Sequence, residues 1–170
     1  MKIKVMLGDI TKIDTVDAIV SATKHSLRGG DGIDGAIHRA AGPQLMEECL
    51  ALRGCNTGEA KLTKAYRLPC KYVIHTVGPL WRGGKYGEEM YLASCYRRTL
   101  LLAAANGIRT IAFPAISTGT YRYPKEEAAK IAIQSVQEFL LDNPDQMDQV
   151  VFVLNEEENY QIYCELLESK

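Results

Sequence analysis

Stretches with a two-residue hydrophobic period alternate along this chain with stretches that have a helical period. Six short runs, mostly apolar or alternating, predict strands over residues 2–7, 16–22, 60–66, 71–77, 109–116 and 150–154. Helical periods begin near Ile33, near Glu88, behind Pro124 and again in the last residues of the chain. Because strands and helices interleave, the sequence predicts a sheet covered on both faces, a three-layer α/β/α fold.

The helical stretches each present one apolar face. The first is expected to run from Ile33 to a stop near Gly54, with an inward face formed by Ile37, Ala41, Leu45, Cys49 and Leu52. The second runs over 88–105 and ends at Asn106-Gly107. The inward face of the third helix comprises Ala129, Ala132, Ile133, Val136 and Leu140, and that of the last comprises Tyr160, Tyr163, Cys164 and Leu167. This pattern predicts helices that pack onto the sheet.

Length, charge and cysteine content limit the class of protein. The 170 residues predict one domain, over 1–170, and the net charge of −1 gives no general attraction to nucleic acid or to an anionic membrane. No apolar run approaches the length of a membrane span, and the first residues lack a signal-peptide core. Five scattered cysteines without a CxxC pair predict reduced thiols, a cytoplasmic location and no metal site.

Two glycine-rich loops are the main candidates for a binding site. RGGDGIDG (28–35) and STGTY (117–121) each follow a predicted strand and precede a helix. In an open α/β sheet such loops meet at the carboxyl edge, where ligands gather. Glycine lets backbone N–H groups approach an anion at a helix N-terminus, although either loop alone is equally a connector. Together they suit a diphosphate with a sugar on each side.

Other nucleotide fingerprints do not fit. There is no GxxxxGK[ST], and GGDGIDG is not a GxGxxG after the first strand, so no redox cofactor is expected. GDIT (8–11) directly follows the first strand. Its Asp9 is suited to accept a hydrogen bond from an exocyclic amine such as adenine N6, or alternatively to cap the next segment of backbone.

Four segments together resemble the macrodomain family, and within it the O-acetyl-ADP-ribose deacetylase-like group called MacroD. They are Gly8-Asp9-Ile10-Thr11, GGDGIDGAIHRAA (29–41), YVIHTVGP (72–79) and PAISTGTYRYP (114–124), in family order over nearly the whole chain. The resemblance implies a mixed central sheet with ADP-ribose in the cleft. It implies that Asp9 holds the adenine amine, that the loop 117–121 holds the diphosphate, and that Tyr121 and the loop 29–35 hold the distal ribose. The ligand-binding candidates are Gly8, Asp9, Ile10, Ser21, Gly29, Gly30, Asp31, Gly32, Ile33, Ser117, Thr118, Gly119, Thr120, Tyr121 and Asn155, the last beside the adenine face.

The sequence departs from the family at the catalytic motif. In hydrolytic members, the counterpart of Asp34 works beside an asparagine ten residues earlier, the last of an NAAN motif. Here SATK (21–24) stands in its place, so that Lys24 replaces this asparagine. Arg122 replaces the last glycine of the family's GxYGYP, and Asp31 stands where glycine is usual.

Lys24 leaves several roles open. Lysine offers donors only, whereas asparagine both donates and accepts. Lys24 is suited to bind a phosphate or a ribose hydroxyl, to pair with Asp34 or Asp31, or to point into solvent. An ammonium beside Asp34 would weaken that carboxylate as a base, so ground-state binding could rise while turnover falls.

The aromatic residues near these motifs have structural and functional interpretations. His38 lies one helical turn after Asp34 and is expected to pack and hold the loop rather than carry a proton. His75, inside an apolar strand, is expected in the core. The sequence decides neither whether His25 reaches the cleft nor whether Trp81 covers a ligand or packs.

Two function classes follow. The first is an enzyme that binds ADP-ribose and hydrolyses O-acetyl-ADP-ribose or an ADP-ribosyl ester on Asp or Glu of a protein, with Asp34 activating or orienting water and Lys24 assisting. The second is a non-catalytic reader of ADP-ribose or ADP-ribosylated protein, suggested by the loss of the asparagine. RNA binding has little support because no basic stripe is present.

Overall fold

The computed structural model describes residues 2–30 and 32–168. Its strands are β1 (Ile3–Leu7), β2 (Ala18–Thr23), β3 (Ala60–Lys64), β4 (Tyr72–Val77), β5 (Thr110–Phe113) and β6 (Gln149–Leu154). Its helices are α1 (Gly32–Ala41), α2 (Pro43–Ala51), α3 (Glu88–Ala105), α4 (Lys125–Asp142) and α5 (Glu157–Glu168), with a 3₁₀ turn, η1 (Ile10–Lys12). The six predicted strands are therefore present within a few residues of their expected bounds.

The six strands form one sheet in the order β1-β6-β5-β2-β4-β3. All neighbouring pairs are parallel except β3 and β4, which are antiparallel. The implied mixed sheet is thus confirmed. Since the five parallel strands end at the same edge, the loops that follow β1, β2, β4, β5 and β6 all open there.

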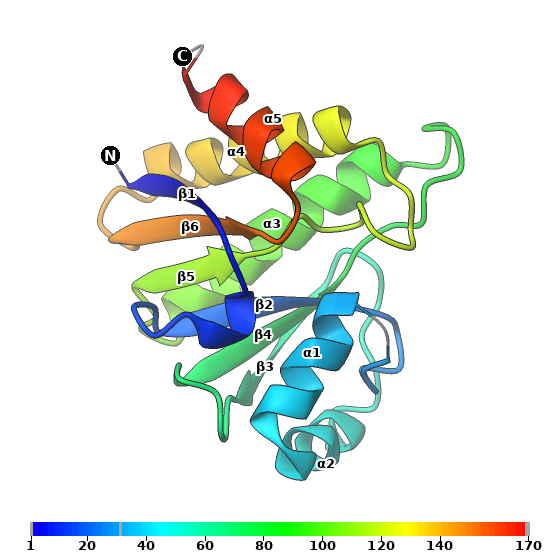
Figure 1. The fold of residues 1–170 in the computed structure, drawn as a ribbon, viewed down its shortest axis with the longest axis vertical. Helices are drawn as coiled ribbons and strands as arrows, with labels where there is room; N and C mark the ends of the chain where they lie inside the picture. Colours follow the sequence, from blue (N-terminus) through cyan, green and yellow to red (C-terminus); the bar gives the residue numbers. More distant parts are fainter. Residues whose placement is uncertain (1, 31, 169–170) are drawn as a thin grey trace.

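Helices cover both faces of the sheet (Figure 1). The helices α3, α4 and α5 pack on one face around the largest core cluster, whereas α1, α2 and η1 pack on the other. The strands alternate between the two cores: Ala18 and Val20 of β2 belong to the first, and Ile19 belongs to the second. Because both faces of the sheet are buried in this way, the strands are largely apolar along their length. The three-layer prediction is confirmed.

The first predicted helix is in fact two helices. Gly42 separates α1 from α2 with φ +90°, a conformation that ends the helix, and Pro43 then begins α2 because the first helical turn does not need its N–H. The predicted inward face continues from α1 into α2, since Ile37, Ala41, Leu45 and Cys49 are all buried. The expectation of one continuous helix was wrong because it followed the period of the apolar residues and overlooked Gly42-Pro43.

The remaining helices agree with their predicted faces. Ala129, Ala132, Ile133 and Val136 of α4 are buried, as is Tyr163 of α5. The five cysteines are all free, and three of them are buried. None of the described helices is both long and apolar enough to cross a membrane.

Four aromatic rings lock the sheet to α3 and α5. Phe113 of β5 and Phe152 of β6 lie 6.1 Å apart, measured between ring centroids, and each contacts Tyr96 of α3. Tyr163 of α5 lies 5.0 Å from Phe152, so the last helix is tied to the same cluster. All four side chains are at most 1% exposed. This cluster lies at the centre of the larger core.

We expect Phe152→Ala to lower the free energy of unfolding by about 3–5 kcal/mol, because it removes apolar contacts from a site that cannot collapse fully. Urea denaturation measures the loss. Leu141→Ala is the control, since Leu141 is 81% exposed and its truncation should cost less than about 0.5 kcal/mol. Equal effects of the two changes would contradict the described core.

Candidate ligand-binding site

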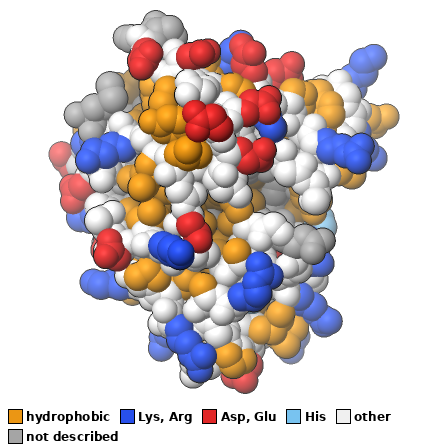
Figure 2. Space-filling model, in the orientation of Figure 1, with side chains coloured by type: hydrophobic (Ala, Val, Ile, Leu, Met, Phe, Trp, Pro, Cys, Tyr) orange, Lys and Arg blue, Asp and Glu red, His pale blue; other side chains and the backbone are white. Residues whose placement is uncertain are grey.

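A cavity of about 400 Å³ opens at the carboxyl edge of the sheet. Its walls come from the β2–α1 segment, the loop after β5 and the start of α5. Figure 2 shows the hollow on this face, with acidic side chains gathered above it over α5. The cavity thus lies at the carboxyl edge of the sheet, where the two glycine-rich loops predicted a binding site.

Most of the predicted site residues line this cavity. They are Lys24, Gly29, Gly32, Ile33, Asp34, Ser117, Thr118, Gly119, Thr120, Tyr121 and Asn155. Five other candidates are absent from the described lining, namely Gly8, Asp9, Ile10, Ser21 and Gly30. Asp31 lies outside the described residues. The structure therefore brings the two glycine loops together and leaves the β1 segment at the margin.

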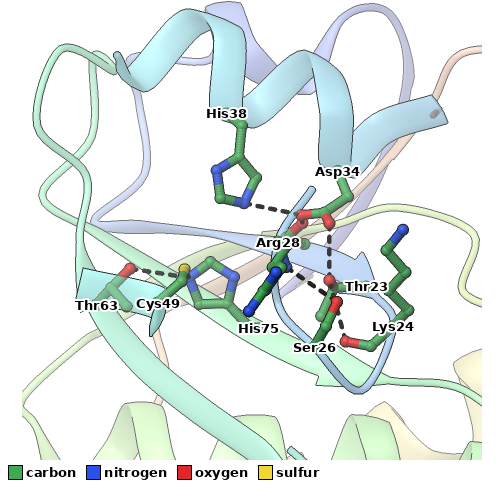
Figure 3. Close-up of polar contacts among 10 residues, drawn as sticks. Thr23, Lys24, Ser26, Arg28, Asp34, His38, Cys49, Thr63 and His75 are labelled. Atoms are coloured by element: carbon green, nitrogen blue, oxygen red, sulfur yellow. Dashed lines mark hydrogen bonds and ion pairs between the residues drawn. The ribbon is translucent and has the colours of Figure 1, made fainter. Parts of the chain in front are cut away.

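The carboxylate of Asp34 is held by two hydroxyl groups of β2. Ser21 Oγ donates to Asp34 Oδ1 at 2.6 Å, and Thr23 Oγ1 donates to Asp34 Oδ2 at 2.7 Å (Figure 3). The two donors are two residues apart, so they share one face of the strand, the face that α1 covers. Asp34 is 5% exposed yet lines the cavity. One carboxylate thus both joins α1 to the sheet and faces the site.

The start of α1 lies unusually close to the glycine loop. A Cβ at Gly35 would come within 1.8 Å of the Gly30 carbonyl oxygen, so only glycine permits this contact. The ring of His38 covers Gly29, and its Nε2 is 3.6 Å from Asp34 Oδ1. The prediction that His38 packs against the loop is confirmed, and the ring also lies next to the carboxylate.

Lys24 lies at the cavity wall without pairing with Asp34. Its Nζ lies 3.3 Å from the position that a Cβ at Gly30 would occupy, so the side chain extends along the glycine loop. Within the described part of the chain, no ion pair involves Lys24. Figure 3 accordingly draws no interaction between the Lys24 ammonium and the Asp34 carboxylate. Lys24 therefore brings an ammonium to the cavity wall.

The loop after β5 is fixed from within the protein. Ser117 adopts φ +68°. Its side chain packs tightly on Gly78, because a Cβ at Gly78 would come within 2.1 Å of Ser117 Oγ. The carbonyl oxygens of Ser117, Gly119 and Tyr121 accept hydrogen bonds from Tyr123, Arg122 and Trp81, respectively. These bonds tie the loop to its own turn and to the neighbouring loop over 78–87.

Arg122 adopts a backbone conformation that favours glycine. Its φ is +60°, a left-handed conformation that costs an arginine free energy. The side chain is exposed. Glycine would adopt this conformation without that cost.

The neighbouring loop over 78–87 supports the loop 117–121, the candidate for diphosphate binding. Trp81 packs on Tyr123 with the two ring centroids 4.7 Å apart, so it packs rather than lining the cavity. The buried carboxylate of Glu88 accepts hydrogen bonds from the N–H groups of Arg82, Gly84 and Tyr86. Burial raises the pKa of Glu88, but these three donors outweigh it and hold the pKa at about 2.

At the end of β1, Asp9 caps η1. Its Oδ1 accepts from the hydroxyl of Thr11 at 2.6 Å and from the N–H of Thr11 at 2.9 Å. These two bonds, the hydroxyl first, lower the pKa of Asp9. The structure thus bears out the capping interpretation, and the remaining carboxylate oxygen is available to another donor.

The other two histidines lie away from the opening. His75 is fully buried, as expected; burial lowers its pKa to about 4, and its Nε2 is 2.9 Å from Thr63 Oγ1. His25 Nδ1 lies 2.9 Å from the carbonyl oxygen of Cys55, so this ring anchors its loop instead of lining the cavity.

Sequence reasoning missed several residues of the site. Asn159 on α5 and Glu156, just before α5, line the cavity. Thr23 both lines the cavity and binds Asp34. The signal for Asn159 was a polar residue one turn before the buried Tyr163, on a face expected to be apolar. Thr23 lies two residues after Ser21 on the strand, which was the available signal for a second donor.

No group of three or more His, Cys, Asp or Glu side chains that could hold a metal ion occurs within residues 2–30 and 32–168. The chemical groups at the cavity are the carboxylates of Asp34 and Glu156, the ammonium of Lys24 and the backbone of the two glycine loops.

Comparisons with known proteins agree with this geometry. Residues 20–132 match the family described as Macro domain. A macro domain-containing protein of Methanosarcina mazei is 61% identical over 142 residues, covering 84% of this chain and 75% of the relative. A Cronobacter turicensis protein named O-acetyl-ADP-ribose deacetylase is 52% identical, covering 98% of this chain and 96% of the relative. A variant of the Oceanobacillus iheyensis macrodomain with ADPR superposes with a TM-score of 0.92 at 44% identity, covering 97% of this chain and 91% of the other. The chain belongs to the macrodomain family, in its MacroD-like group.

The Glu88 anchor should make stability depend on pH. A carboxyl whose pKa is lowered from 4.5 to about 2 stabilises the fold above pH about 4.5, and this contribution disappears as the pH falls towards 2. We expect Glu88→Gln to lower the melting temperature at pH 7 and to differ less from wild type near pH 2.5. The neighbouring exposed Glu89, changed to Gln, is the control. A difference in melting temperature between Glu88→Gln and the wild type that stays constant with pH would contradict this role.

Proposed function

We propose that the cavity binds ADP-ribose and that the protein hydrolyses an ADP-ribose ester, either O-acetyl-ADP-ribose or ADP-ribosyl groups on Asp or Glu of another protein. The observation that carries this proposal is the Asp34 carboxylate, fixed by Ser21 and Thr23 at the cavity wall opposite the loop 117–121. The names of the similar proteins support it.

Binding follows from the two loops. The loop 117–121 has its carbonyls engaged on the protein side, and its backbone N–H groups are suited to the diphosphate. The N-terminus of α1 and the glycine loop before it would surround the distal ribose, within reach of Asp34. Asp9, at the end of β1, would then accept from the adenine amine with its second oxygen.

Asp34 has the geometry to orient the attacking water. Each carboxylate oxygen accepts one hydroxyl and retains further acceptor capacity, so a water at the cavity side can donate to it. The water oxygen attacks the ester at the distal ribose, the ester C–O bond breaks, and the water provides the hydroxyl of one product and the proton of the other. His38, 3.6 Å from Asp34 Oδ1, keeps this carboxylate enclosed.

Lys24 would stabilise negative charge that develops on the substrate. Lys24 lines the cavity together with Asp34, and its ammonium would lie near the ester oxygens of the substrate. A positioned cation stabilises the oxyanion that develops when water attacks an ester. An asparagine supplies such a donor without a charge, so Lys24 replaces it with a stronger electrostatic partner but without an acceptor.

A reader function is the second candidate, and one observation favours it. The asparagine that works with Asp34 in hydrolytic relatives is absent, and Lys24 cannot accept a hydrogen bond from a ribose hydroxyl or a water. An ammonium that strengthens binding of substrate and transition state equally would improve affinity without accelerating hydrolysis.

Hydrolysis of O-acetyl-ADP-ribose and of a Glu-linked ADP-ribosyl peptide tests the proposal. We expect turnover by the wild type, a fall in kcat of about 10²-fold or more for Asp34→Asn, and a loss of activity for Lys24→Asn. Lys64→Asn makes the same change at an exposed position on β3 and should leave the rate unchanged.

Two results would contradict the enzyme assignment. Binding of ADP-ribose with no product from either substrate at high protein concentration would favour the reader, as would a gain of activity for Lys24→Asn. Thermal unfolding of each variant shows whether a loss of activity reflects a loss of fold.

A further inference from the structure

The order of the strands places the two ends of the cavity on different sides of the sheet. The order is β1-β6-β5-β2-β4-β3, with the loop 117–121 after β5 and Lys24 directly after β2. Under the proposed function, on which this inference rests, the diphosphate lies on the loop 117–121 and the distal ribose lies at Asp34. A group esterified to that ribose therefore extends towards β4 and β3.

Three segments meet around this end of the cavity. They are 24–28 after β2, 53–57 before β3, and 78–91, which follows β4 and includes the start of α3. The N–H of Cys55 donates to the carbonyl oxygen of His25 at 3.0 Å and so joins the first two segments. Gly78 lines the cavity, and the N–H of Trp81 donates to the carbonyl oxygen of Tyr121 at 2.9 Å. We call these three segments the distal rim.

The distal rim is basic. Its exposed cations are Lys24, Arg28, Arg53, Arg82 and Lys85. All residues of the three segments are described, and among them Glu89 is the one exposed acidic side chain. At the opposite end, Glu156 lines the cavity, and Glu157 and Glu158 are exposed at the start of α5. Lys125 pairs with two of these three carboxylates, so that end keeps a negative charge. The two ends of the cavity therefore differ in the sign of their charge.

The distal rim also exposes large apolar side chains. Tyr86 is 62% exposed and Met90 is 64% exposed. A Cβ at Gly87 would lie 3.6 Å from the Tyr91 ring and 3.8 Å from Met90 Cε, so both side chains lie beside the turn that carries Tyr86. The guanidinium carbon of Arg82 lies 4.6 Å from the centroid of the Tyr86 ring. Tyrosine, methionine and arginine are side chains that protein interfaces favour.

The backbone beneath these side chains is held from within the protein. The buried Glu88 carboxylate accepts hydrogen bonds from the N–H groups of Arg82, Gly84 and Tyr86. Side chains presented on a backbone that is already ordered lose less conformational entropy when a partner binds. The turn before α3 is therefore suited to contact another chain.

We propose that the distal rim binds the polypeptide that carries the ADP-ribosyl group, and that it favours a polypeptide with acidic residues beside the modified side chain. ADP-ribose in the cavity would place the ester bond between Asp34 and this rim, so the attached chain lies against the rim. The basic side chains attract acidic neighbours of the modified residue, and the glutamates of α5 lie at the other end of the cavity. The rim thus gives a protein substrate contacts that O-acetyl-ADP-ribose cannot make.

Hydrolysis of three substrates tests this assignment. Two are peptides of equal length with ADP-ribose on a central Glu, flanked by Asp and Glu in one and by Ser and Gln in the other. The third is O-acetyl-ADP-ribose. We expect the wild type to hydrolyse the acidic peptide with a kcat/KM about 3- to 10-fold above that of the neutral peptide at low ionic strength. The ratio should fall towards one in high salt, because salt screens exposed charges.

Variants of exposed rim side chains separate charge from apolar contact. Arg82→Gln combined with Lys85→Gln should remove the preference for the acidic peptide through KM rather than kcat, because these contacts act on substrate and transition state alike. Tyr86→Ser should lower kcat/KM for both peptides by about 5-fold. O-acetyl-ADP-ribose turnover should stay unchanged in both. Arg97→Gln combined with Arg98→Gln removes the same charge more than two turns after the start of α3 and should keep the preference.

Several outcomes would overturn the inference. They are equal kcat/KM of the wild type for the two peptides, a preference that survives the Arg82 and Lys85 changes, an equal loss on O-acetyl-ADP-ribose, and turnover of O-acetyl-ADP-ribose without turnover of either peptide. If ADP-ribose binds but none of the three substrates is hydrolysed, the Kd values of the two intact peptides make the same comparison for a reader. Failure of the folded wild type to bind ADP-ribose at all would instead contradict the proposed function itself.

Discussion

The binding of Asp34 by the two β2 hydroxyls is the interaction on which the site depends. Ser21 and Thr23 donate to opposite oxygens of one buried carboxylate and so fix the start of α1 against the sheet. Because α1 begins directly after the glycine loop, the same two bonds also fix the entrance of the cavity. Loss of either donor would leave a buried charged oxygen unsatisfied, which is costly in a low-dielectric interior.

The opposite wall is held by different means. The loop 117–121 receives hydrogen bonds on its carbonyls, and one of these comes from the loop that Glu88 anchors. The aromatic cluster behind β5 and β6 fixes the strand ends from which this loop and α5 emerge. Walls that are already held by such contacts would lose little affinity to ordering when a ligand binds between them.

The sequence predicted the features that depend on local patterns. Hydrophobic periods indicated the layers, and the glycine loops indicated the edge of the sheet that forms the site. The break at Gly42 was overlooked because the apolar face continues across it. The partners of Asp34 and the buried amide of Asn159 left only weak signals in the sequence, since they depend on how a helix packs against the rest of the fold. The Lys24 ammonium, for which several directions remained open, lies along the glycine loop.

A crystal structure of the protein with ADP-ribose tests the central claim most directly. The account predicts the diphosphate on the backbone of residues 117–121, and a distal ribose hydroxyl or a water within hydrogen-bonding distance of Asp34, with the bonds from Ser21 and Thr23 retained. A ligand bound elsewhere, or an Asp34 carboxylate that turns away from the cavity when the ligand binds, would contradict it.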